Sequence, residues 1–474
     1  MKENKLSIKN KLAFASADIF GGGSFNIINF LYPGFLALTV GLSPYWIGFI
    51  MFIARVWDAV SDPLMGIISD RTTNAKFGKR RVYLVISAPL ILLAMFLMFF
   101  PYSFESVGLR VVAVLLSYLL FCTVQTMMMI PYYSLSSELS SDYGQRASAN
   151  SFRLGFSIFS SILCVAVPGI IVDMVGNDNG YIVMSLIFGL LFGLSVLITG
   201  LFSREEIVTP ALKRKFNFKE FLVFLKVKPF LQYLGMLLCV QLTMAIMSAM
   251  YFFYIDFCFA RDITAAGGTS PYGLIGAALM FSTQIVALPL YLKLINKKSK
   301  AYVYKFGSVI WIVSAAVLFL VPPGAPGYLI ILGSFAIGAG ISGPGLIPHA
   351  IFGDVADACQ LINGKRNEGT MSGFVNFLNK VAQAIGLAAV MAILGAFGFV
   401  SKEAGADAIV SQSESAQLAI KSVLCFAPAV VMSLGILIAN TYTITAEKQH
   451  EIQTAIQSND EDKIKELRKE YICE

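Results

Sequence analysis

The sequence has few charged residues for its length. Asp, Glu, Lys and Arg make up 14% of its 474 residues, whereas hydrophobic residues make up 57%. Soluble domains carry about 25% charged and about 45–50% apolar residues. The composition therefore excludes an ordinary soluble enzyme, a disordered chain and a nucleic-acid-binding protein, and it predicts that a lipid bilayer surrounds most of the chain. The net charge of +7 does not indicate a nucleic-acid partner, because excess Lys and Arg usually marks the cytoplasmic loops of membrane proteins.

The sequence also lacks the residue patterns of metal and nucleotide chemistry. It has only two His residues and neither an HExxH motif nor paired CxxC motifs, so a transition-metal site is not expected. No glycine-rich phosphate loop is followed by Lys and Ser or Thr, which argues against ATP-driven transport. Most of the seven Cys residues lie in apolar runs, where free thiols pack as small hydrophobes. We therefore expect no enzyme activity and no cofactor other than a coupling cation.

Long apolar runs predict membrane-spanning helices. A spanning helix needs about 20 mostly apolar residues, whereas a barrel strand has about 10 residues with strict alternation. The runs are too long and too uniformly apolar for strands, so we expect an all-α membrane protein with twelve transmembrane helices. The predicted spans are residues 12–39, 44–69, 82–101, 108–137, 147–173, 181–202, 229–257, 272–296, 303–321, 328–352, 369–399 and 417–443.

One polar segment, 203–228, divides these spans into two sets of six. It holds seven basic and three acidic residues, which is typical of a cytoplasmic linker. We predict an N-terminal six-helix bundle over 1–202 and a C-terminal six-helix bundle over 229–443. The remaining segment, 444–474, is predicted to be a cytoplasmic tail. Because this tail is charged and amphipathic, we expect a short cytoplasmic or interfacial helix in it.

Basic residues gather in alternate loops. They are concentrated before the first span, after the second, in the linker and after the eighth, and they are few in the loops of the other side. The positive-inside rule then places both termini in the cytoplasm. We expect a multi-pass protein of the plasma membrane, such as the inner membrane of a bacterium. Its partners would be the bilayer and a small-molecule substrate, with no nucleic acid, and we expect it to function as a monomer.

The second span carries three ionisable residues, and charged groups inside a span are costly and often functional. Asp58 and Asp62 are four residues apart and share one helix face with Arg55. Two close carboxylates repel each other unless a cation or proton lies between them. Hard cations such as Na⁺ prefer oxygen ligands. We therefore predict a cation site at Asp58 and Asp62 that could hold Na⁺, with the Ser61 hydroxyl as a further ligand. The alternative is a buried ion-pair network with Arg55 that only holds helices together.

Other spans also carry polar residues. Arg153 lies in the fifth span, and Lys380 lies in the eleventh, within a polar stripe on an otherwise apolar helix. Such a stripe favours a face toward a cavity rather than lipid, although the amides alone are also explained by interhelical hydrogen bonds. The stripe consists of Asn376, Asn379, Lys380 and Gln383. Side chains expected to line the same cavity are Asp18, Asn26, Asn29, Gln125 and Thr126.

Four segments together resemble a known family. The second span reads Arg55-Val56-Trp57-Asp58-Ala59-Val60-Ser61-Asp62-Pro63-Leu64-Met65-Gly66, and the loop after it contains Ser69-Asp70-Arg71 and Gly78-Lys79-Arg80-Arg81. Further along are Ile130-Pro131-Tyr132-Tyr133-Ser134-Leu135 and Gly353-Asp354-Val355-Ala356-Asp357. These motifs, spread over both halves, resemble the glycoside–pentoside–hexuronide:cation symporters of the major facilitator superfamily, the family of melibiose permease.

The resemblance implies a major facilitator fold with a central, alternately accessible site. It implies a cation site at Asp58 and Asp62, with Thr126 as a third ligand. Ser61 stands where the family pattern has Asn, which leaves Na⁺, Li⁺ and H⁺ open as coupling cations. Arg153 and Lys380 match family positions that line the cavity.

The sequence departs from the family pattern at the sugar site. Gly22 and Met129 stand where melibiose permease has the carboxylates that bind its galactoside, whereas an aromatic residue is kept at Tyr133. We predict a sugar or glycoside substrate, and the retained Arg153 and Lys380 favour an acidic one, such as a uronide. The alternative is a lysolipid or another amphiphile, because a vertebrate relative with this fold carries lysolipids.

We therefore predict cation-coupled symport by alternating access. A membrane-embedded enzyme would need a convergent catalytic set in the spans, and a non-transporting sensor would need an added signalling domain; we find neither. Charged residues at the helix ends are predicted to form a cytoplasmic gate. They are Asp70, Arg71, Glu138, Asp142 and Arg146 in the N-terminal half and Asp354, Asp357, Lys365, Arg366 and Glu368 in the C-terminal half.

Overall fold

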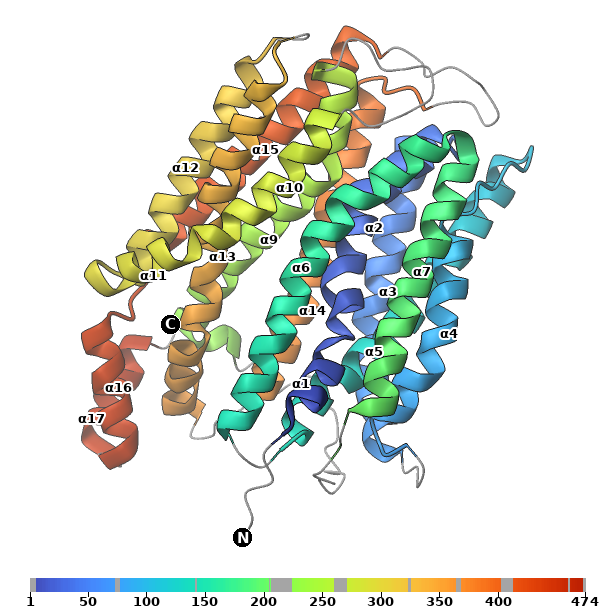
Figure 1. Cartoon of the computed structure of the whole chain (residues 1–474). Coiled ribbons are helices and arrows are strands. Elements are labelled where there is room, and N and C mark those ends of the chain that lie inside the picture. Colours follow the sequence, from blue (N-terminus) through green and yellow to red (C-terminus); the bar gives the residue numbers. More distant parts are fainter. Residues whose placement is uncertain are drawn as a thin grey trace. The chain divides into compact units, whose positions relative to one another are not determined.

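A computed structural model describes most of the chain, and its described residues are almost entirely helical (Figure 1). The described residues are 6–72, 77–140, 143–203, 205, 224–259, 271–322, 325–363, 368–401, 412–458 and 461–471. The chain divides into two compact units. Unit 1 consists of Met1–Lys213, Ser248–Ala278 and Leu387–Ile420, and unit 2 consists of Arg214–Met247, Leu279–Gly386 and Lys421–Glu474.

The helices of the first half of the chain lie in unit 1. They are α1 (Ile8–Ala15), α2 (Asp18–Leu38), α3 (Pro44–Arg71), α4 (Arg81–Met98), α5 (Val107–Glu138), α6 (Tyr143–Val175) and α7 (Asn177–Phe202). Within this unit α2 packs on α6, α3 on α5, and α4 on both α5 and α7.

The second half of the chain contributes to both units. Four helices extend from one unit into the other: α9 (Lys228–Tyr254), α10 (Pro271–Val286), α14 (Glu368–Ala396) and α15 (Glu414–Asn440). Unit 1 also holds the π-helical turn η2 (Ile255–Phe259). Unit 2 holds η1 (Phe224–Lys226), α11 (Leu288–Lys297), α12 (Lys300–Leu320), α13 (Tyr328–Asn363), α16 (Ala446–Ser458) and α17 (Glu461–Tyr471). The predicted domain boundaries depend on the linker 203–228, most of which lies outside the described residues. These boundaries therefore stay a prediction.

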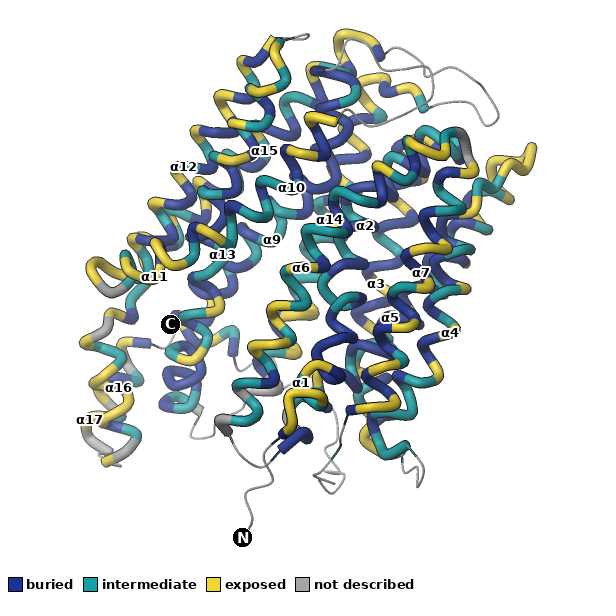
Figure 2. Tube along the Cα trace, viewed as in Figure 1, coloured by how far each residue is buried: buried dark blue, intermediate teal, exposed yellow. Residues whose placement is uncertain are grey.

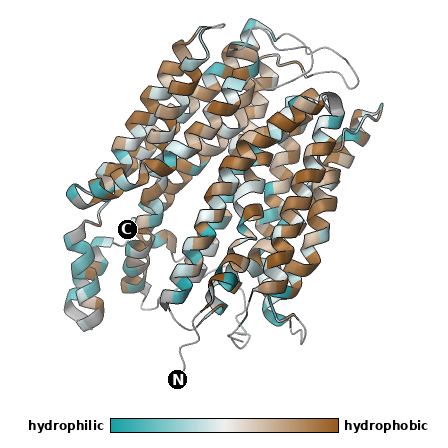
Figure 3. Ribbon diagram, in the orientation of Figure 1, coloured by the Kyte–Doolittle hydropathy of each residue, from teal (hydrophilic) through white to brown (hydrophobic). Residues whose placement is uncertain are grey.

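The predicted membrane helices are confirmed. Among the described residues, ten helices are long and apolar enough to span a membrane. The helices α2 and α3 occupy the first two predicted spans and are not among those ten, because they hold the polar residues discussed above. Figure 2 shows exposed residues along most helices, and Figure 3 shows that the helices are largely hydrophobic. Exposed apolar residues include Leu190, Leu194 and Ile198 of α7, at 43–53% exposure. Such exposed apolar residues are compatible with lipid as the solvent.

The first predicted span is broken, which the sequence did not indicate. The helix α1 ends at Ala15 and α2 begins at Asp18. The side chain of Ser16 donates to the carbonyls of Ala13 and Ser195, both at 2.9 Å, and the Thr199 hydroxyl of α7 accepts from the Ala17 amide at 3.0 Å. These side chains satisfy backbone groups that the break leaves unpaired. The break places Asp18 in the first turn of α2.

Candidate functional site

Two ionisable residues in the middle of α3 are deeply buried. Arg55 is 3% exposed and Asp58 is 2% exposed, and the Arg55 guanidinium lies 3.7 Å from a carboxylate oxygen of Asp58. The guanidinium also donates to the Asn29 side chain of α2 at 3.2 Å and lies over the Phe25 ring at 5.2 Å. Arg55 therefore compensates the charge of Asp58. The alternative interpretation, a buried network with Arg55 that holds helices together, requires this ion pair, and the ion pair is present. Asn29 accepts a hydrogen bond from its guanidinium.

Three oxygen-bearing side chains meet one turn further along α3. The Thr126 hydroxyl of α5 donates to a carboxylate oxygen of Asp62 at 2.8 Å. The Ser61 hydroxyl lies 3.3 Å from the Thr126 hydroxyl and donates to the Asp58 carbonyl at 3.4 Å. The structure thus brings together Ser61, Asp62 and Thr126, with Asp58 one turn away. The formal charges of Arg55, Asp58 and Asp62 sum to minus one.

A second polar cluster lies between α2, α5 and α6. Asp18 is 7% exposed, accepts a hydrogen bond from the Ser157 side chain and is attracted by the charge of Arg153. The Arg153 guanidinium lies 5.5 Å from the ring centre of Tyr133. Met129 is 7% exposed, and its terminal methyl group packs beside Gly21. Asp18, Met129, Tyr133 and Arg153, all predicted to contact substrate, are therefore neighbours within unit 1.

Gly22 lies where α2 crosses α6. A Cβ atom at this position would lie 2.7 Å from the Ser157 carbonyl oxygen and 2.8 Å from its Cα atom. The Gly22 carbonyl accepts from Asn26 at 3.2 Å and from Ser161 at 3.1 Å. The crossing has no room for the aspartate of the family pattern. Gly22 therefore has a packing role here, and its place among the substrate residues stays a prediction.

We expect Gly22→Ala to destabilise the protein by about 1–3 kcal/mol, because the added methyl group would overlap the α6 backbone. Gly34 is the matched control on the same helix, since a Cβ atom there meets nothing within 4 Å. We expect Gly34→Ala to be neutral or to stabilise the helix by about 0.5–1 kcal/mol. Thermal denaturation midpoints of the two purified variants test this. Equal midpoints would contradict the tight crossing.

The remaining predicted substrate residues make separate contacts. The Gln125 amide lies 3.5 Å from the Ser24 hydroxyl of α2, which is the interhelical hydrogen bond of the alternative interpretation. On α14, the Gln383 amide donates to Asn379 at 3.1 Å. Asn376 is exposed, and Lys380 is half-buried in the same stripe. These α14 residues belong to unit 2.

A charge cluster joins α3, α4 and α5 at their ends. Arg80 is 5% exposed, and its guanidinium lies 2.6 Å from Asp70 and 3.3 Å from Glu138, which is 4% exposed. The guanidinium also donates to the Ser69 hydroxyl at 2.7 Å. Glu205 accepts from the backbone amides of Lys79 at 2.9 Å and Arg80 at 3.2 Å. The sequence analysis predicted Asp70 and Glu138 as gate residues but did not include Arg80, the cation that pairs with both. The position of Arg80 in the loop motif could have indicated it.

The other predicted gate residues are more scattered. Asp354 pairs with Lys300 of α12, and Asp357 binds side chains of α16. Arg71 is exposed in the last turn of α3, and Arg146 is half-buried. Asp142, Lys365 and Arg366 lie outside the described residues, as does the side chain of Glu368.

At the opposite end of unit 1, the start of α3 packs on the last part of α14. A Cβ atom on Gly48 would lie 3.0 Å from the Met391 Cβ atom, and one on Gly395 would lie 2.6 Å from the Tyr45 ring. The Phe30 ring of α2 lies 5.8 Å from that of Phe252. These contacts join helices of the two sequence halves at this end.

The family is defined by comparison with known proteins. A model described as "MFS/sugar transport protein" matches residues 13–446, so the chain belongs to this family of the major facilitator superfamily. The chain is 27% identical to the uncharacterized symporter sll1374 of Synechocystis, over 97% of this chain and 98% of the relative. It is 24% identical to the sodium-dependent lysophosphatidylcholine symporter 1-B of Danio rerio, over 94% and 89% of the two chains.

Solved structures agree on the fold. The nucleoside transporter NupG is 14% identical, with a TM-score of 0.60 over 92% of this chain and 99% of that one. A bacterial homologue of the human peptide transporters PepT1 and PepT2 is 12% identical, with a TM-score of 0.63 over 91% and 98%. The major facilitator fold and the prediction of a cation-coupled symporter are therefore confirmed.

Proposed function

We propose that the protein is a Na⁺-coupled symporter whose cation binds at Asp62, Thr126 and Ser61, with Asp58 as the adjacent carboxylate. The observation that carries this proposal is the cluster of oxygen groups around Asp62, where Thr126 donates at 2.8 Å. Oxygen ligands suit a hard cation. The relatives named as sodium-dependent support Na⁺ over Li⁺ and H⁺. We further propose that the ends bearing Arg80 and the tail face the cytoplasm, across a plasma membrane.

The helix α5 links the cation cluster to the second polar cluster. Thr126, Met129 and Tyr133 are spaced at i, i+3 and i+7, so they share one helix face. Thr126 contacts Asp62 and Tyr133 contacts Arg153. A cation that changes the Thr126 hydrogen bond would therefore shift Tyr133 and Arg153. Such coupling is reciprocal, so each ligand would raise the affinity for the other.

An acidic glycoside is the substrate that the second cluster favours. Arg153 supplies a guanidinium that can bind a carboxylate with two hydrogen bonds. Met129 has replaced the carboxylate that a neutral galactoside would use, and the Tyr133 ring is 48% exposed and able to pack on a sugar face.

A lysolipid is the second candidate, and one observation favours it. A groove of about 650 Å³ lies along α6, lined by Leu12 of α1 and by Phe152, Phe156 and Phe159. Arg153 lies on the neighbouring face of the same helix. An acyl chain could fill this apolar groove while Arg153 binds a phosphate. The lysophosphatidylcholine symporters among the relatives support this candidate.

A ligand panel separates these candidates. We expect glucuronides to raise the thermal denaturation midpoint of the purified protein by several degrees, more in NaCl than in choline chloride, because the ligand binds only the folded state. Neutral galactosides should have no effect. A shift with lysophosphatidylcholine alone, at concentrations below micelle formation, would favour the second candidate. Shifts that are equal in NaCl and choline chloride would contradict cation coupling.

A further inference from the structure

The short helix α11 has one side buried in unit 2 and one side exposed. The buried side packs on α12 and α13, where Tyr291 is 5% exposed and its hydroxyl donates to the Ala339 carbonyl at 2.9 Å. On the other side, Leu290, Lys293 and Lys297 are exposed, and their spacing of i, i+3 and i+7 places them on one helix face. The exposed face of α11 therefore combines an apolar side chain with two lysines.

The lysines in and after α11 form a cluster of positive charge. Residues 263–353 contain no Asp or Glu, whereas five Lys residues lie within 293–305. Of these, Lys300 alone pairs with a carboxylate in the described part of the chain, that of Asp354 of α13. Most of the positive charge of this segment is therefore not balanced by the described residues, and an anion outside the chain can bind it.

An exposed aromatic and apolar face of α12 begins beside this cluster. The Lys298 ammonium lies 6.0 Å from the centre of the Tyr302 ring. That ring stacks on Phe306 with centres 6.2 Å apart, and the two residues are 40% and 45% exposed. The same helix face continues with exposed apolar side chains at Val309, Val313, Val317 and Leu320. Tyrosine is typical of the membrane–water interface, so this face indicates a lipid contact that starts at the interface.

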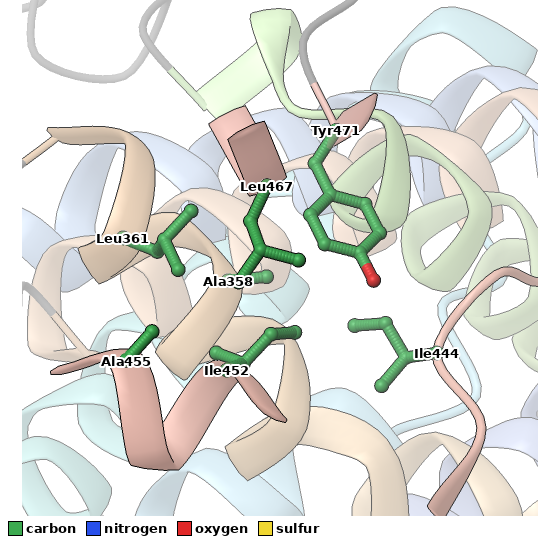
Figure 4. Close-up of a cluster of buried hydrophobic side chains, with 7 residues drawn as sticks. All are labelled: Ala358, Leu361, Ile444, Ile452, Ala455, Leu467 and Tyr471. Carbon is green, nitrogen blue, oxygen red and sulfur yellow. The ribbon is translucent and has the colours of Figure 1, made fainter. Parts of the chain in front are cut away.

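The tail of the chain does not cover this surface. It forms a hairpin of α16 and α17 rather than the single short helix expected from the sequence, and the hairpin packs on the end of α13. Figure 4 shows its apolar side chains meeting Ala358 and Leu361 of α13. Ile452, Ala455 and Tyr471 are completely buried there. Because the apolar side of the tail is already buried on α13, the faces of α11 and α12 are left for the bilayer.

We propose that α11 and the start of α12 form a binding site for an anionic phospholipid of the surrounding bilayer. The phosphodiester group contacts Lys293, Lys297 and Lys298, and an acyl chain lies along Tyr302 and Phe306. Lysine clusters beside a membrane-spanning helix attract anionic head groups, and the aromatic face distinguishes a lipid from a free phosphate. The proposal depends on the membrane fold and not on the identity of the transported substrate or coupling cation.

Native mass spectrometry of the full-length protein, titrated with lipid in detergent, measures the affinity for the first bound lipid. We expect dioleoylphosphatidylglycerol to bind at least tenfold more tightly than dioleoylphosphatidylcholine, which has the same acyl chains but no net charge. Glycerol 1-phosphate has the head-group chemistry without the chains and should bind at least a hundredfold more weakly than phosphatidylglycerol. Equal affinities for the two lipids would overturn the anionic site. Glycerol 1-phosphate bound as tightly as phosphatidylglycerol would overturn the lipid as its occupant.

Two charge-matched variants test the position of the site. Lys297→Gln with Lys298→Gln should lower the affinity for phosphatidylglycerol at least fivefold and leave that for phosphatidylcholine unchanged. Lys226→Gln with Lys228→Gln is the control, because it removes the same charge from exposed positions of the same unit, at η1 and the start of α9. We expect its affinity to change less than twofold. An equal loss in both variants, or no loss in the first, would overturn the site.

Discussion

Asp62→Asn is expected to abolish Na⁺-driven accumulation of substrate. Asparagine has nearly the shape of aspartate and keeps an oxygen that can accept from Thr126, so the fold should survive. The change removes the charge of the carboxylate that accepts from Thr126. A cation in a low-dielectric span depends strongly on such a charge. We expect the Na⁺ affinity to fall at least tenfold, equivalent to about 1.4 kcal/mol of binding free energy. Transport of substrate down its own gradient should be retained.

Ser61→Ala is the matched control for this prediction. It removes a neutral ligand beside the same carboxylate, so we expect a smaller loss of Na⁺ affinity than in Asp62→Asn. Proteoliposomes with imposed Na⁺, Li⁺ or pH gradients measure both variants. Full concentrative uptake by Asp62→Asn would reject the site. If Ser61→Ala loses more affinity than Asp62→Asn, the hydroxyl rather than the carboxylate would dominate the cation site.

Arg80→Ala is expected to cost about 3–5 kcal/mol of stability. It leaves the carboxylate of Glu138, which is 4% exposed, without the guanidinium at 3.3 Å. Breaking a buried ion pair from one side leaves an uncompensated charge, which is the source of this large penalty. Asp70 loses the guanidinium at 2.6 Å in the same variant but keeps Lys79 at 3.7 Å, and because Asp70 is exposed this loss should contribute little.

The controls for Arg80 vary charge and burial separately. Arg80→Lys keeps the charge but loses the planar group that reaches Ser69, Asp70 and Glu138 together, so we expect an intermediate loss. Arg71→Ala, in the exposed last turn of α3, should change stability by no more than about 0.5 kcal/mol. Thermal denaturation in the presence of lipid measures all three. An unchanged midpoint in Arg80→Ala would show that Glu138 is neutralised in another way.

The sequence predicted the helices better than their interruptions. The predicted span 108–137 became α5, Val107–Glu138, because a long apolar run leaves the backbone in a membrane little choice other than helix. The break after Ala15 was missed because Thr199, which satisfies the Ala17 amide, lies 182 residues further along the chain. The predicted span 272–296 is also broken, because α10 ends at Val286 and α11 begins at Leu288, just before Pro289. The sequence analysis missed this break too.

The candidate site was predictable where it depended on helix periodicity. The spacing of Arg55, Asp58 and Asp62 placed them on one face, and the structure has Arg55 beside Asp58. The contact between Asp62 and Thr126 joins two helices, so only the family resemblance indicated it. The cation Arg80 and the docking of the tail on Asp357 depend on contacts across 58 and 92 residues of chain, respectively. Periodicity within one helix carries no information about such contacts.

The central claim is that the cluster around Asp62 binds the coupling cation. Equilibrium binding of ²²Na⁺ to the purified protein, in choline chloride, tests it most directly because it needs no knowledge of the substrate. The account predicts saturable binding to the wild-type protein and a loss of at least tenfold in affinity in Asp62→Asn. Saturable binding of equal affinity in both proteins, or no saturable binding to the wild type, would contradict it.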